Sequence, residues 1–108
     1  MHTAYITHPS SLRHDMGADH PECPARIQAI EDQLIASGLL PFLDHQEAPR
    51  ATDEILARVH HPDYIAAIRA AAPDAGLAYL DPDTAMNPHT LEAALRAAGA
   101  VVLAVDMV

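Results

Sequence analysis

The sequence has 108 residues, the length of one domain, and half of them are hydrophobic, which excludes a disordered chain. Fifteen acidic residues against six arginines and no lysine give a formal net charge of −9, which argues against binding to duplex nucleic acid or to an anionic membrane surface. The single cysteine, Cys23, excludes an internal disulfide and a cysteine-rich zinc module.

The first third of the chain predicts a strand, a loop and a helix. Residues 4–7 have a β-prone centre and lie close to Pro9, which favours a short strand over a helix. Residues 8–19 are polar and predict a loop. Residues 24–37 predict a helix with a proline in its first turn and Gly38 directly after its end. Its apolar residues recur at helical spacing and share one face: Ile27, Ile30 and Leu34.

The middle of the chain predicts a weak strand and two helices. The strand candidate is residues 43–47. Thr52 suits the N-cap of the next helix, which has two acids in its first turn. A further helix begins at Pro62 and ends before Pro73. The apolar residues expected on these two helices are Ile55, Leu56 and Val59, then Tyr64, Ile65 and Ile68.

The last third predicts turns followed by a helix. Residues 75–87 are rich in turn-forming residues, and a helix begins near Asn87 and Pro88. Its apolar stripe consists of Leu91, Leu95, Ala98, Val102 and Val105. The β-branched residues within 101–105 leave a strand open as an alternative. The chain stops on this apolar run without a Gly or Pro stop signal, as we expect of a segment cut from a longer domain.

The order of these elements predicts an α/β protein with two credible strands. Since a two-stranded sheet is marginal on its own, the chain is either a mainly helical small domain or one end of a larger α/β protein, and the abrupt end favours the second. We expect a cytoplasmic protein, because the sequence lacks both the features of a signal peptide and the roughly 20 apolar residues of a membrane span.

The densest group of reactive side chains lies within residues 14–23. It contains possible metal ligands of every common type: His14, Asp15, Asp19, His20, Glu22 and Cys23. No second ligand pair follows at zinc-finger spacing, so a polar loop with Glu22 near the helix N-terminus is favoured over a metal site. Cys23 has no feature of an activated thiolate.

Two further pairs of reactive residues favour structural interpretations. His60 and His61 are adjacent, and adjacent helical side chains do not face each other, so we interpret them as a helix boundary. Asp81 and Asp83 flank a proline, which favours a turn over an acid–base pair.

The string HDMGADHPECPAR, residues 14–26, resembles the N-terminal signature of the histone deacetylase superfamily. The likeness is strongest to the class II-like bacterial branch, which includes acetoin-utilisation-type proteins and acetylpolyamine amidohydrolases. The matching positions are His14, Asp15, Gly17, His20, Pro21, Glu22, Pro24 and Arg26. Residues 59–68 look like a helix of this family, and residues 80–100 look like its Asp-Thr loop and the helix that follows. The resemblance therefore covers nearly the whole chain.

The resemblance implies that residues 1–108 are the N-terminal part of an arginase/deacetylase-like fold. That fold has three layers around a central parallel sheet, incomplete here and mainly helical. Family enzymes use one Zn²⁺, held by two Asp and one His, with a tandem His pair and a Tyr at the reaction centre. His60 and His61 are not this tandem pair, because they lie in the earlier helix match. The Asp-x-His metal segment, the later metal Asp and the catalytic Tyr of the family have no counterpart in this sequence.

By this resemblance, the whole protein is a zinc-dependent deacetylase, an amidohydrolase that acts on acetylated amines such as acetyl-lysine or acetylpolyamines. We expect this chain to have no catalytic residue, to bind no zinc, and to be inactive without the C-terminal part of its own domain. Two other functions stay open. One is a stand-alone acidic binding module without catalysis; the other is a small metal-binding protein that uses His14, His20 and Cys23.

The resemblance also assigns roles to two loops at the rim of the substrate tunnel. The first rim loop contributes His14, Asp15, Gly17, His20, Pro21 and Glu22. The second contributes Asp83 and Thr84, and its Asp accepts hydrogen bonds from substrate backbone N–H groups, a task that suits a carboxylate. Asp81 remains an alternative for that role. A structural role is the alternative for Pro21, Glu22 and Arg26, which would fix the first loop to the sheet.

Overall fold

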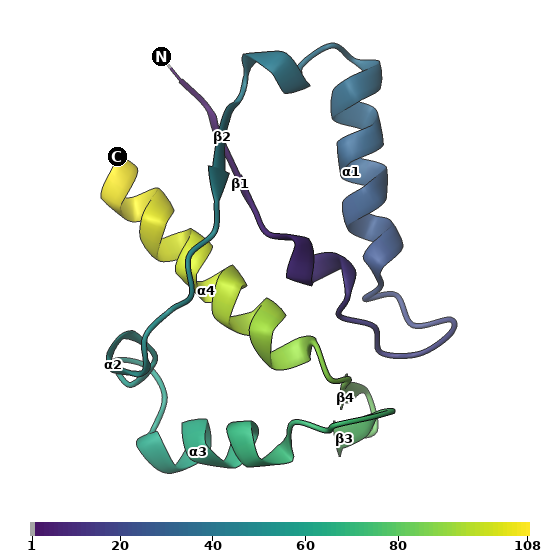
Figure 1. Cartoon of the computed structure of the whole chain (residues 1–108), viewed down its shortest axis with the longest axis vertical. Coiled ribbons are helices and arrows are strands. Elements are labelled where there is room, and N and C mark those ends of the chain that lie inside the picture. The colour runs from purple at the N-terminus through teal and green to yellow at the C-terminus, as the bar shows by residue number, and fades with distance from the viewer. Residues whose placement is uncertain (1) are drawn as a thin grey trace.

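The computed structural model describes residues 2–108 and places their strands in two separate small sheets (Figure 1). β1 (Ala4–Thr7) pairs in parallel with β2 (Asp44–Glu47). β3 (Ala78–Asp81) and β4 (Thr84–Met86) form an antiparallel hairpin. Because parallel neighbours need a crossover connection, a helix between β1 and β2 returns the chain to the same end of the sheet.

Helices and short 3-10 turns account for the other elements. In chain order they are η1 (Pro9–Leu12), α1 (Pro24–Ala36), η2 (Leu40–Phe42), α2 (Asp53–Leu56), α3 (Pro62–Ala71) and α4 (Thr90–Met107). α4 runs diagonally through the middle of the molecule and packs against β1 and η1, whereas α1 packs against η1 and η2 (Figure 1). The chain therefore has the incomplete, mainly helical α/β architecture that the sequence predicts. Within residues 2–108, no helix has the length and apolar character needed to cross a membrane.

Most of the predicted strands and helices are confirmed, together with their caps. The first two strands and the helices that follow them lie where the sequence places them. The hydroxyl of Thr52 accepts a hydrogen bond from the N–H of Ile55 at 3.2 Å and caps α2. His61 caps α3, because its Nδ1 accepts from the N–H of Asp63 at 3.1 Å. The predicted helix start after His61 is thus confirmed, whereas the preceding helix, α2, ends at Leu56 and does not reach His60.

The prediction of turns alone for residues 75–87 is wrong, because this segment contains the β3–β4 hairpin. The Asp81 carboxylate accepts a hydrogen bond from the N–H of Asp83 at 2.8 Å. This side-chain turn reverses the chain tightly enough for very short flanking segments to pair. Strands of three and four residues are too short for their alternation to be recognised in the sequence.

Three smaller differences concern the ends of elements. The loop predicted over residues 8–19 contains η1, which the His8 side chain caps. Val59 lies beyond the end of α2 and is 84% exposed, so it does not belong to that helix. The strand alternative for residues 101–105 is wrong, since α4 continues to Met107 and adding a residue to an existing helix costs little.

The buried core is small and rests on methionine and alanine. Its apolar members are Met16, Ala48, Ala51, Ala85, Met86 and Leu95. Among the described residues no isoleucine or valine is buried. Ile30 on α1 is 49% exposed, and Val101 and Val105 on α4 are 65% and 70% exposed. Helix faces that are apolar in the sequence therefore lie open, as the fragment interpretation predicts.

A close approach of two backbones joins α4 to the segment that leaves β2. The carbonyl of Leu95 in α4 accepts a hydrogen bond from the N–H of Ala51 at 3.0 Å. A Cβ atom on Gly99 would overlap the carbonyl oxygen of Pro49 and lie 2.7 Å from its carbonyl carbon. Only glycine lets the two backbones come this close.

Charged groups reinforce the same contact. A single carboxylate oxygen of Glu92 accepts hydrogen bonds from Nε of Arg50 at 2.9 Å and from Nε of Arg96 at 3.0 Å. Arg96 also donates to the carbonyl of Ala48 at 3.0 Å. The Arg50 bond, and after it the Arg96 bond, hold the pKa of Glu92 below its ordinary value.

We expect the substitution G99A to destabilise the fold by about 1–3 kcal/mol, because the added methyl pushes α4 away from Pro49. Helix propensity alone predicts the opposite, a gain of about 1 kcal/mol. Urea unfolding followed by far-UV circular dichroism measures the difference. The matched control is A97G at an exposed position of the same helix, which reports propensity only. A gain in G99A equal to the loss in A97G would contradict the close approach.

We expect the variant E92Q to be less stable than the parent by about 0.5–1 kcal/mol at neutral pH. The pKa of Glu92 is lowered in the folded state, so its contribution is fully present above the unfolded value, near 4.5. The contribution is lost as the pH falls through the lower folded value. Urea unfolding at a series of pH values measures the difference, with D74N at an exposed loop carboxylate as control. A difference between E92Q and the parent that persists unchanged to pH 2 would rule out this origin.

Candidate functional site

The two loops that the sequence marks as rim loops meet each other in the structure. Nε2 of His20 in the first loop lies 3.1 Å from the carbonyl oxygen and 3.2 Å from a carboxylate oxygen of Asp83 in the second. The hollow between the loops has a volume of about 280 Å³. Its lining consists of Met16, Ala18, Asp19, His20, Pro21, Tyr79, Pro82, Asp83 and Ala85. Two predicted site residues that are far apart in the sequence are therefore in direct contact.

Side chains of the first rim loop hold its own backbone. The Asp15 carboxylate accepts a hydrogen bond from the N–H of Gly17 at 2.9 Å, and His20 Nδ1 accepts from the N–H of Glu22 at 3.0 Å. Gly17 has φ +104° and Asp19 has φ +64°, both in the left-handed region. Glycine is suited to such a backbone, and aspartate is among the residues that tolerate it best.

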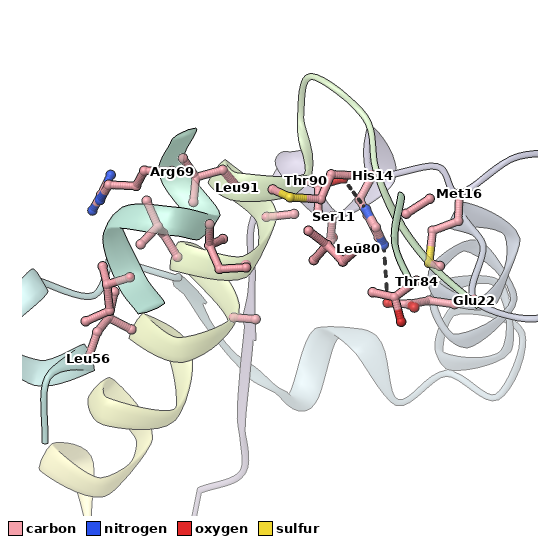
Figure 2. A pocket seen from close by; sticks show the side chains of 18 of the residues that line it. Ser11, His14, Met16, Glu22, Leu56, Arg69, Leu80, Thr84, Thr90 and Leu91 are labelled. Atoms are coloured by element: carbon pink, nitrogen blue, oxygen red, sulfur yellow. Dashed lines mark hydrogen bonds and ion pairs between the residues drawn. The ribbon is translucent and has the colours of Figure 1, made fainter. Parts of the chain in front are cut away.

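His14 ties the first rim loop to the start of α4. Figure 2 shows its two ring nitrogens facing different partners: Nδ1 lies 2.7 Å from Oγ1 of Thr90, and Nε2 lies 3.2 Å from Oε1 of Glu22. Asn87 adds a second link, since its amide donates to the carbonyl of Arg13 at 2.7 Å and its own N–H donates to Thr90 Oγ1 at 2.9 Å. Thr90 and Asn87 were not singled out from the sequence, where they read only as a helix start.

Asp83 and Asp81 have different environments. The Asp81 carboxylate closes the hairpin turn by accepting the N–H of Asp83. The side chain of Asp83 is 94% exposed, so its carboxylate faces solvent except where His20 contacts it. This favours Asp83 over Asp81 as a carboxylate open to a ligand. Thr84 begins β4, is exposed, and lines a second, larger cavity.

That larger cavity is an apolar groove between α1, α3, α4 and the hairpin, with a volume of about 530 Å³. Its apolar walls include Ile27 from α1, Ile65 and Ile68 from α3, and Leu91 and Leu95 from α4. Figure 2 shows Glu22 and Thr84 near one end of the groove and Arg69 at the other.

Pro21, Glu22 and Arg26, for which the sequence left a structural role open, have different surroundings. Pro21 lines the hollow between the rim loops. Glu22 directly precedes Cys23, the N-cap of α1, and its carboxylate contacts His14 at 3.2 Å. Within the described residues this carboxylate makes no hydrogen bond with an N–H of α1. Arg26 lies exposed in the first turn of α1 and lines the groove. Within residues 2–108 no hydrogen bond or ion pair involves its guanidinium.

The described residues do not fit the zinc ion that the family resemblance implies. No group of three or more His, Cys, Asp or Glu side chains in residues 2–108 is arranged to hold a metal. His14 faces Thr90 and Glu22, whereas His20 faces Asp83, so these two imidazoles and Cys23 do not converge. A donor set of two Asp and one His is likewise not assembled within this part of the chain.

A cluster that the sequence did not indicate has the composition of a nucleophilic triad. Nδ1 of His8 lies 2.8 Å from the hydroxyl of Ser10, and Nε2 lies 3.4 Å from a carboxylate oxygen of Glu47. Ser10 is only 4% exposed and lines neither cavity. His8 Nδ1 also accepts the backbone N–H of Ser10 at 3.1 Å. The cluster therefore caps η1 and links it to β2, and a substrate has no access to the hydroxyl.

Comparison with known proteins gives a consistent result. Residues 20–108 match the histone deacetylase domain family. A histone deacetylase-like amidohydrolase from Pseudomonas aeruginosa is 36% identical over 91 residues, which cover 84% of this chain and 24% of that protein. The uncharacterised protein slr0245 from Synechocystis is 34% identical over 100 residues, 90% of this chain and 33% of that protein.

A solved structure agrees with the sequence matches. The crystal structure of the HDA15 HD domain superposes on 93% of this chain with a TM-score of 0.80 and 26% sequence identity, and the matched part is 30% of that chain. This chain thus spans only 24% and 33% of the length of the curated relatives it matches.

We expect T90V to loosen the first rim loop, because valine removes the hydroxyl that both His14 and the N–H of Asn87 contact. Leaving these partly buried groups unpaired costs about 1–3 kcal/mol. Amide hydrogen exchange of residues 14–22 measures the loosening, and T90S, which keeps the hydroxyl, is the matched control. Equal protection of the loop in T90V and T90S would show that His14 does not anchor it.

Proposed function

This chain belongs to the histone deacetylase domain family, and we propose that residues 1–108 form the N-terminal part of a zinc-dependent deacetylase. In this proposal the whole enzyme is cytoplasmic and hydrolyses the amide of an acetylated amine, such as acetyl-lysine or an acetylpolyamine. The observation that carries the proposal is the family match over residues 20–108 together with the signature at residues 14–26. The amidohydrolase from Pseudomonas aeruginosa supports the reaction class.

The contribution of this chain to the reaction is substrate recognition. The described residues offer no group of three metal ligands, so the metal and the reacting groups belong to other parts of the enzyme. The exposed carboxylate of Asp83 is available to accept hydrogen bonds from N–H groups of the substrate. His14 and His20 keep the two rim loops in place around it.

A stand-alone acidic binding module is less well supported. Such a module would cover the apolar faces that are open here, because large exposed apolar patches mark surfaces that contact something else. The groove of about 530 Å³ and the exposed Val101 and Val105 favour a chain that packs against further protein.

We expect the purified 108-residue chain to show no deacetylase activity with added zinc. A chimera provides the positive test: the 91 aligned residues of the Pseudomonas aeruginosa protein are replaced by those of this chain. If the chain is the equivalent part of an amidohydrolase, the folded chimera hydrolyses an acetyl-lysine peptide within about tenfold of its parent's kcat/KM, a loss of roughly 1.4 kcal/mol. Zinc-dependent turnover by the chain alone, or a folded chimera without activity, would contradict the proposal.

We expect D83A in this chimera to raise KM for an acetyl-lysine peptide about tenfold or more, with little change in kcat. The lost hydrogen bonds to a charged group are present in both the ground state and the transition state. D74A, at an exposed loop carboxylate outside both cavities, is the control. An unchanged KM in D83A would remove Asp83 from substrate binding.

A further inference from the structure

His20 and Asp83 form an unequal pair. The side chain of His20 is 20% exposed and lies between the rim loops, whereas that of Asp83 is 94% exposed. His20 is therefore poorly placed to touch a substrate itself. Its Nε2 instead contacts the carbonyl and the carboxylate of Asp83, and this carboxylate is the group that is exposed to solvent.

The protons of the His20 ring follow from its neighbours. A backbone N–H is always a donor, so Nδ1, which lies 3.0 Å from the N–H of Glu22, is an acceptor and carries no proton. In the neutral ring the proton is then on Nε2, which faces two acceptor atoms of Asp83. The loop backbone thus fixes the tautomer that donates to Asp83, and the ring needs no positive charge to do so.

Asp83 is constrained at both its backbone and its side chain. Its N–H donates to the Asp81 carboxylate, and one of its own carboxylate oxygens is held by His20. The remaining acceptor sites of the carboxylate face solvent. A side chain that is already held loses less rotamer freedom when a ligand binds, which improves affinity without a new contact.

We infer that His20 is a positioning residue, which presets the Asp83 carboxylate to accept N–H groups of the substrate. This inference rests on the proposed role of Asp83 in substrate binding. It also identifies the substrates affected: those that have N–H donors beyond the scissile amide, such as the backbone of an acetyl-lysine peptide. A small acetylated alkylamine without such donors gains nothing from a preset carboxylate.

The first test is a ¹⁵N spectrum of the histidine rings in the 108-residue chain, which does not depend on enzyme activity. The expected result is an Nε2–H tautomer for His20 and a shift of its Nε2 resonance in D83A. A spectrum with the proton on Nδ1, or one that D83A leaves unchanged, would overturn the inference whatever the chain does as part of an enzyme.

The second test uses the chimera described above and separates positioning from general stability. H20F keeps a ring but removes the donor, and H20Q restores an N–H donor at a similar reach. We expect H20F to raise KM for an acetyl-lysine peptide about two- to tenfold, H20Q to stay within about twofold of the parent, and neither to alter KM for N-butylacetamide. H89F, at an exposed histidine whose side chain caps nothing, is the control.

A double variant gives the decisive comparison. If His20 acts through Asp83, H20F adds no further increase in KM once D83A is present. Additive effects of H20F and D83A, or an H20F effect on both substrates alike, would show that His20 has only a structural role. A chimera that is inactive without any of these substitutions would count against the proposed function. In that case the ring spectrum by itself would still test whether His20 donates to Asp83.

Discussion

The architecture depends on how closely α4 approaches the segment that leaves β2. The absence of a side chain at Gly99 allows the helix backbone to touch Pro49, and the Leu95 carbonyl then accepts the N–H of Ala51. This contact joins the parallel strand pair to the long helix, which also packs against β1 and η1, and it matters the more because the buried core is small. The Arg50–Glu92–Arg96 cluster adds charge-assisted bonds at the same junction.

The start of the same helix contacts the first rim loop and directly follows the hairpin. Thr90 at its first turn holds His14 of the first rim loop, and the hairpin with Asp83 precedes it in the chain. A contact in the middle of α4 therefore fixes where the rim residues lie, although it is not part of the candidate site. The open groove along α3 and α4 shows that this unit presents its apolar faces outward, as a part of a larger α/β domain does (Figure 2).

Local signals predicted most of the helices and the first two strands. Proline and glycine positions with helical periodicity located the helices, because these features depend on neighbouring residues only. Periodicity shows which helix face is apolar but not what covers it. The exposure of Val101 and Val105 follows instead from the interpretation of the chain as one part of a larger domain. The family resemblance identified His20 in the first signature and Asp83 in the Asp-Thr loop, but the contact between them joins distant parts of the sequence and depends on the fold. The importance of Gly99 could not be predicted from the sequence, because the need for a glycine in this helix comes from the neighbouring Pro49 backbone.

The most direct measurement is the nucleotide sequence that follows the codon for Val108 in the source genome. The central claim is that this chain is the recognition-bearing front part of a zinc-dependent deacetylase. It predicts an open frame that continues into a tandem-histidine segment and an Asp-x-His metal segment. A genuine stop codon at that position, with neither segment downstream, would contradict the claim and leave a binding module as the account of this protein.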